Sequence, residues 1–154
     1  LIKLGLLPGG HIETLTADHP TLTYNTIGRH LSRMVNTKVI STKSPWMCDA
    51  KAGEIYTVPI SHGEGRFIAS PQQVLEFNKT GQIATQYVDF DGIASMDSRF
   101  NPNQSVAAIE GIYSPDGRVF GKMAHSERCG AGISKNIYGQ LEMPIFTSGV
   151  KYFK

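Results

Sequence analysis

The feature that most constrains the fold is a helix signal enclosed by strand signals. Ser70 as a helix N-cap, Pro71 at the first helical position and Gly81 after the last turn predict a helix in SPQQVLEFNKTG. Alternating segments rich in Thr, Val and Ile lie on both sides of this helix and predict strands over Tyr24–Ile27, Arg33–Thr42, Glu54–Ser61 and Gln82–Asp89. This order favours an α/β layer structure with one mixed sheet.

The remaining segments complete this arrangement. Two apolar runs around the turn sequence Ser114-Pro115-Asp116-Gly117 predict a hairpin. A helix that opens at Leu1 is expected to end between Gly5 and Gly10, and IFTSGVKYF near the C-terminus predicts a short closing helix. Irregular connections are expected over Ser44–Gly53 and Phe90–Ser105. No internal repeat or linker divides the chain, so the sequence predicts a single domain.

Composition excludes several classes of function. The chain has 154 residues, of which 40% are hydrophobic and 18% charged, as in a soluble domain with its own core. The net charge is +2 and the Lys and Arg residues are scattered, so nucleic-acid binding is not indicated. No apolar run approaches the roughly 20 residues that cross a bilayer, which favours a cytoplasmic protein without membrane contact. Cys48 and Cys129 lie far apart and are expected to be reduced thiols.

The stretch KMAHSERC places His125 and Glu127 two residues apart at the end of a predicted strand. Residues i and i+2 of a strand face the same side, so the carboxylate can orient the imidazole. A general base held in one tautomer by a carboxylate is the arrangement that activates a Cys or Ser nucleophile. A solvated surface pair is the alternative that this spacing alone leaves open.

Two other short motifs are candidates for ligand contact. In HGEGR, two glycines bracket Glu64 at the end of a predicted buried strand, so the loop can bring backbone N–H groups and the Glu64 and Arg66 side chains to a ligand; a tight surface turn is the alternative. Asn101-Pro102-Asn103 reads as a turn when taken alone. The His-x-Glu pairs at His62 and His125 lack the spacing of known metal motifs, and we predict no metal site.

Together, VPISHGEGRF, NPNQS and AIEGIYSPDGRVFGKMAHSER resemble, in this order, the glutamine amidotransferase domain of phosphoribosylformylglycinamidine synthase. The resemblance implies a flavodoxin-like, class I amidotransferase fold with a Cys-His-Glu triad. His125 matches the general base of that triad and Glu127 the residue that orients it. It also implies contact with glutamine or with the synthetase domain for His62, Gly63, Glu64, Gly65, Arg66, Asn101 and Asn103. The chain departs from the family pattern at Gln104, usually a glycine, and at Ala124 and Ser126, often prolines.

The nucleophile of the triad is expected to lie outside these residues. LIKLGLLPGG resembles the helix that follows the family's nucleophile turn, and Leu1 starts within an apolar helical pattern without a capping residue. Residues 1–154 are therefore expected to be the C-terminal portion of the domain, without its N-terminal strands and nucleophile elbow. Neither Cys48 nor Cys129 follows a strand-turn-helix pattern that would activate it. The isolated chain is expected to be inactive, and to self-associate or to be only marginally stable.

The resemblance implies a ligase whose glutaminase part supplies ammonia from glutamine. The synthetase part of the parent enzyme would use that ammonia, with ATP and Mg²⁺, to convert formylglycinamide ribonucleotide to its amidine in purine biosynthesis. No cofactor is implied for this chain. Two alternatives remain at this point: another class I glutamine amidotransferase, and a non-catalytic ligand-binding or interaction module.

Overall fold

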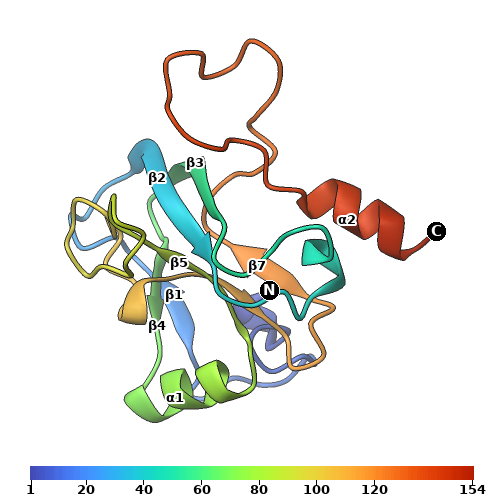
Figure 1. The fold of residues 1–154 in the computed structure, drawn as a ribbon. Coiled ribbons are helices and arrows are strands. Elements are labelled where there is room, and N and C mark those ends of the chain that lie inside the picture. Colours follow the sequence, from blue (N-terminus) through green and yellow to red (C-terminus); the bar gives the residue numbers. More distant parts are fainter.

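The computed structural model describes residues 1–154 and contains two β-sheets and two α-helices (Figure 1). The larger sheet has five strands in the order β3-β2-β5-β6-β7, and the smaller sheet pairs β1 with β4. The strands of the larger sheet are β2 (Leu31–Val39), β3 (Ile55–His62), β5 (Ile83–Tyr87), β6 (Ile109–Tyr113) and β7 (Phe120–Lys122). The smaller sheet consists of β1 (Thr21–Thr23) and β4 (Arg66–Ile68).

The expectation of a mixed sheet is wrong, because every strand pair is antiparallel. Parallel neighbours need a crossover connection, usually a helix, between two strands of one sheet. The helix α1 (Pro71–Lys79) instead joins β4 of the smaller sheet to β5 of the larger one. The predicted hairpin around Ser114–Gly117 is present and joins β6 to β7.

Most of the predicted strands are confirmed, with ends shifted by a few residues. The strand predicted over Tyr24–Ile27 is wrong, and the observed strand β1 ends one residue before Tyr24. The backbone turns there, since the Gly28 N–H donates to the Asn25 carbonyl at 2.9 Å and Gly28 has a φ of 67°. The apolar alternation that suggested a strand therefore lies in a turn in which Tyr24 is exposed.

Two predicted helices form as expected. In α1, the Ser70 side chain and Gln73 make a reciprocal capping box, and α2 (Ile145–Tyr152) closes the chain. The opening helix is only a 3₁₀ turn, η1 (Ile2–Leu4), because Gly5 takes a left-handed conformation at φ 80°. Two further 3₁₀ turns are η2 (Pro45–Met47) and η3 (Val106–Ala108). None of the helices is both long and apolar enough to cross a membrane.

The larger sheet curls so that its two outer strands approach each other. After β7, Ala124 forms an antiparallel bridge with Ile60 of β3, and the His125 N–H donates to the Pro59 carbonyl at 2.8 Å. Because β3 and β7 are the outer strands, this contact joins opposite edges of the sheet. The chain that follows β7 extends as a long loop before α2 (Figure 1). Buried side chains beneath the curled sheet include Val58, Ile60, Tyr56, Tyr87, Tyr113 and Ala124.

Candidate active site

The His125 and Glu127 side chains meet as the sequence spacing predicts. Nδ1 of His125 lies 2.6 Å from Oε1 of Glu127. The predicted reason is wrong, however, because β7 ends at Lys122 and the pair lies in a turn in which the Arg128 N–H donates to the His125 carbonyl at 3.2 Å. The two side chains therefore approach each other across a turn, at the place where the edges of the sheet meet.

The electrostatics of the pair favour an ionised Glu127. Partial desolvation acts to raise the pKa of Glu127, but hydrogen bonds from its own backbone and from His125, with the charges of His125 and Arg128, lower it below its usual value. The Arg128 Nε lies 3.8 Å from Oε1 of Glu127. With Nδ1 of His125 engaged by Glu127, Nε2 is the ring nitrogen left to exchange a proton with a ligand. This geometry suits a general base.

The HGEGR loop lies beside this pair, at the end of β3. The His125 N–H bonds to Pro59, only three residues before His62. Burial lowers the pKa of His62, and the neighbouring charges of His30 and His125 lower it further, whereas Glu110 opposes the change. His62 is therefore a neutral imidazole at physiological pH, and the structure places it in the same region as His125.

A close backbone approach explains the second glycine of the loop. A Cβ atom at Gly65 would overlap the imidazole ring of His62, whereas a Cβ atom at Gly63 would meet nothing within 4 Å. The ring thus packs flat on the Gly65 backbone. Both ring nitrogens of His62 are buried without a hydrogen-bond partner, as is Nε of Arg66. Glu64 is exposed at the tip of the loop.

Two asparagines hold the HGEGR loop from inside. The Asn25 side chain accepts from the Gly65 N–H at 3.1 Å and donates to the His62 carbonyl at 2.8 Å. The Asn103 amide donates to the Gly65 carbonyl at 2.6 Å and to the Tyr87 hydroxyl at 3.0 Å. Sequence reasoning missed Asn25, because it lies in the segment taken for a strand. The signal that could have found it is the Asn-x-x-Gly turn from Asn25 to Gly28.

The NPN motif is internal. Asn101 and Asn103 are fully buried. The Asn101 side chain bonds to both backbone groups of Ser105, donating to the carbonyl at 2.9 Å and accepting from the N–H at 3.1 Å. The motif therefore forms a closed turn, and its connection to the HGEGR loop runs through Asn103.

Neither cysteine is paired with His125. The Cys48 thiol donates to the Ser148 carbonyl at 3.5 Å, beside α2, and the Cys129 thiol donates to the Ser126 carbonyl at 3.1 Å. Both are free thiols. The structure contains no group of three or more His, Cys, Asp or Glu side chains that could hold a metal ion.

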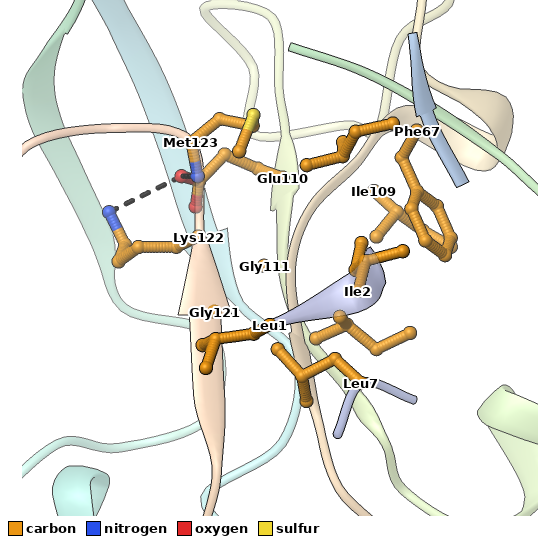
Figure 2. Close-up of a pocket in the computed structure, with 12 residues that line it drawn as sticks. Leu1, Ile2, Leu7, Phe67, Ile109, Glu110, Gly111, Gly121, Lys122 and Met123 are labelled. Carbon is orange, nitrogen blue, oxygen red and sulfur yellow. Dashed lines mark hydrogen bonds and ion pairs between the residues drawn. The ribbon is translucent and has the colours of Figure 1, made fainter. Parts of the chain in front are cut away.

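A largely apolar cavity of about 190 Å³ lies beside the start of the chain (Figure 2). Figure 2 shows Leu1, Ile2 and Leu7 on one side of it, and the paired side chains of Glu110 and Lys122 at another. Its remaining lining residues come from β1, β4, β6 and β7, except Met123, which follows β7. The cavity can therefore accept apolar side chains next to Gly121, Lys122 and Met123, which precede His125 in the chain.

Comparison with known proteins shows the family of this chain. Residues 1–153 match the family described as the CobB/CobQ-like glutamine amidotransferase domain, and the chain belongs to this family. Curated relatives carry the name phosphoribosylformylglycinamidine synthase subunit PurQ. The protein of Treponema denticola is 41% identical over 143 residues, covering 82% of this chain and 51% of the relative. That of Aquifex aeolicus is 31% identical over 133 residues, covering 86% and 53%.

A solved structure supports the same assignment. The structure of PurLQS from Thermotoga maritima matches with a TM-score of 0.63 and 25% identity, covering 87% of this chain and 53% of that one. The resemblance noted in the sequence and the expected class I amidotransferase fold are thereby confirmed. The chain spans about half the length of the curated relatives that it matches.

Proposed function

We propose that this chain is the part of a PurQ-type glutaminase that carries the histidine and the glutamate of the catalytic triad. The observation that carries the proposal is the 2.6 Å contact between His125 and Glu127, in a chain whose relatives are named phosphoribosylformylglycinamidine synthase subunit PurQ. The confirmed family favours this reading over a non-catalytic binding module. Another class I amidotransferase would share the pair, but the named relatives favour the PurQ type.

In the proposed mechanism, a cysteine thiolate attacks the carboxamide carbon of glutamine. His125 delivers a proton through Nε2 to the leaving nitrogen, which departs as ammonia and leaves a γ-glutamyl thioester. His125 then takes a proton from the attacking water, and the thioester is cleaved to glutamate with return of the thiolate. Glu127 keeps Nδ1 of His125 protonated throughout, because its carboxylate accepts that hydrogen bond.

We further propose that residues 1–154 are the C-terminal portion of the domain and that the nucleophile comes from a preceding segment. Support comes from the relatives, which are about twice as long as the matched region. It also comes from the two cysteines present, whose thiols bond to backbone carbonyls rather than to His125. The cavity beside Leu1 supports the proposal too, since it offers an apolar surface to a further strand or helix.

The HGEGR loop is proposed to contact glutamine or the synthetase. Its position next to His125, the exposed Glu64 and the unpaired Nε of Arg66 support a role in recognising a polar partner. Asn101 and Asn103 are proposed to serve this role indirectly, by holding the loop, because both are buried and bonded within the protein. Gly65 would allow the His62 ring to pack on the loop backbone, and Gly63, which has open space beside it, would leave room for the partner.

The partners and location follow from the proposed enzyme. Ammonia would pass to a synthetase that uses ATP and Mg²⁺ to convert formylglycinamide ribonucleotide to its amidine in the cytoplasm, and this chain itself would bind neither. The solved neighbour is named as a PurLQS assembly, which supports a partner of synthetase type. In isolation, the exposed Leu1, which lines the cavity, and the exposed Leu4 would favour self-association.

Covalent labelling tests the proposal. The product of the complete reading frame that contains these residues, here called the complete protein, is treated with a chloroketone analogue of glutamine and digested for mass spectrometry. We expect one labelled cysteine, outside residues 1–154, with loss of glutamate release from glutamine. Protection by glutamine is the control. An adduct on Cys48 or Cys129 would show that the nucleophile lies within this chain and that the proposed arrangement is wrong.

A further inference from the structure

Glu110 is a buried carboxylate that the proposed mechanism does not use. It lies on β6, and its side chain is 0% exposed. Removing a carboxylate from water is costly unless hydrogen bonds and an opposite charge compensate for the loss. All partners of Glu110 are hydrogen-bond donors or cations, and they offset the cost of removing its carboxylate from water. We therefore ask what this buried carboxylate does.

The donors to Glu110 come mainly from the segment that precedes His125. Oε1 accepts from the backbone N–H of Ala124 at 2.6 Å and of Met123 at 3.0 Å. The Lys122 ammonium lies 3.3 Å from the same oxygen. The other oxygen, Oε2, accepts from the Thr85 hydroxyl at 2.5 Å on the neighbouring strand β5. The carboxylate thus links β5 and β6 to the segment that follows β7.

Lys122 completes the restraint from the other side. Its ammonium also donates to the Ala124 carbonyl at 2.9 Å. The N–H of Ala124 is therefore bonded to Glu110 and its carbonyl to Lys122, so one ion pair fixes both peptide groups of the residue before His125. Figure 2 shows this pair, with Met123 above it.

The need for this restraint comes from the path of the chain. The β6–β7 ladder ends at Lys122, after which the chain leaves β6 and crosses to β3 on the opposite edge of the sheet. At the crossing, the Met123 N–H still donates to the Glu110 backbone carbonyl at 3.1 Å, and the Glu110 carboxylate accepts from the N–H groups of both Met123 and Ala124. The Ala124 N–H can make this bond because residue 124 is not proline, which has no N–H.

We propose that Glu110 is a positioning residue for the glutaminase reaction: it fixes Ala124 through Lys122 and two backbone N–H groups and so sets the place of His125 against Glu127. The inference rests on the proposed catalytic role of His125. Glu110 itself does not touch the substrate, since all of its bonds are internal. Its loss should reduce the rate of turnover rather than the affinity for glutamine.

The test uses two substitutions in the complete protein and two readouts. Glu110→Leu removes both acceptors, whereas Glu110→Gln keeps one oxygen that can accept the Met123 and Ala124 N–H groups. Glu76→Gln, at an exposed position of α1, is the matched control. Hydrogen exchange followed by mass spectrometry reports on the backbone from Met123 to Glu127, and glutamate release gives kcat and KM for glutamine.

For Glu110→Leu, we expect at least about tenfold faster exchange in this segment, with β2 and β3 unchanged, and at least about tenfold lower kcat with KM within about twofold. Glu110→Gln should recover most of the protection from exchange and most of kcat. If the Leu variant does not fold, the Gln variant alone tests the proposal. Unchanged exchange in both variants would overturn the inference. Faster exchange with unchanged kcat, while His125→Ala is inactive, would also overturn it and leave the proposed function intact. Full activity of His125→Ala would instead reject the proposed function.

Discussion

Oε1 of Glu127 lies 2.6 Å from Nδ1 of His125, across a turn that begins where the two edges of the curled sheet meet. Replacing Glu127 by Gln keeps the shape of the side chain but offers an amide that can also donate to Nδ1, which favours the wrong tautomer of the imidazole. We expect kcat for glutamate release by the complete protein to fall by about 10²- to 10⁴-fold, with the fold unchanged.

The ¹⁵N chemical shifts of the His125 ring in the same variant show whether Glu127 acts by fixing the tautomer of the ring or only by its negative charge. The native protein should show the Nδ1–H tautomer, and Glu127→Gln should show a mixture. Asp116→Asn, an exposed acid in the β6–β7 turn, is the control and should change neither the shifts of His125 nor kcat. Unaltered tautomer and rate in Glu127→Gln would remove the orienting role from Glu127.

The packing of His62 on Gly65 predicts a difference between the two glycines of the HGEGR loop. A Cβ at Gly65 would overlap the His62 ring, so Gly65→Ala should displace the ring into water and raise its pKa toward about 6.5. Gly63→Ala meets nothing and is the matched control. An NMR titration of His62 measures both; equal pKa values in the two variants would show that the ring does not pack on Gly65.

The buried hydrogen bonds of Asn103 predict that this loop residue contributes to the stability of the fold. Asn103→Ala leaves the buried Tyr87 hydroxyl without its partner and weakens the support of the Gly65 carbonyl. We expect the free energy of unfolding to fall by roughly 1–3 kcal/mol. The control, Asn78→Ala on the exposed side of α1, should be neutral or slightly stabilising. Denaturant titration compares them, and equal midpoints would contradict the bracing role.

The lowered pKa of His62 predicts a pH dependence of stability. In the unfolded chain, His62 is protonated near pH 6.5. In the folded chain, burial lowers the pKa of His62, and the charges of His30 and His125 lower it further, against the opposing charge of Glu110. The unfolded state therefore binds more protons just below pH 6.5, and the free energy of unfolding falls as the pH decreases, by at most about 1.4 kcal/mol per pH unit.

The variant His62→Gln lacks this titration. The difference in unfolding free energy between the native protein and His62→Gln should therefore be constant above pH 7. Between pH 6.5 and 5, the native protein should lose stability relative to His62→Gln. The depressed carboxyl pKa of Glu127 acts at lower pH, with stability lost only as its carboxylate protonates below about pH 4.5. A difference independent of pH from 8 to 5 would mean that His62 titrates normally in the folded protein.

The sequence predicted local structure where local chemistry decides it. The α1 capping box and the turn that joins β6 to β7 were both readable from a few residues. The direction of pairing was not, because it depends on which sheet each strand enters, and β4 enters the smaller one. The strand over Tyr24–Ile27 failed because Asn25 uses its side chain to hold a distant loop, a contact that no local pattern reveals.

In the candidate site too, features set by neighbouring residues were predictable and features set by distant contacts were not. The spacing of His125 and Glu127 predicted their contact, although a turn rather than a strand produces it. Glu110 looked like an ordinary strand residue, and its bonds to Met123 and Ala124 arise only when the chain crosses the curled sheet. Gln104, where the resembled family usually has glycine, does adopt a left-handed φ of 60°, so that departure pointed to a real backbone constraint.

The most direct test of the account is the rate of glutamate release from glutamine by the complete protein carrying His125→Ala. His11→Ala, which removes an exposed imidazole near the start of the chain, is the matched control. If His125 moves the protons of the reaction, kcat should fall by at least about 10²-fold in His125→Ala and should stay within about twofold in His11→Ala. Native turnover by His125→Ala would contradict the central claim, since the His125–Glu127 contact would then be a surface pair without a part in catalysis.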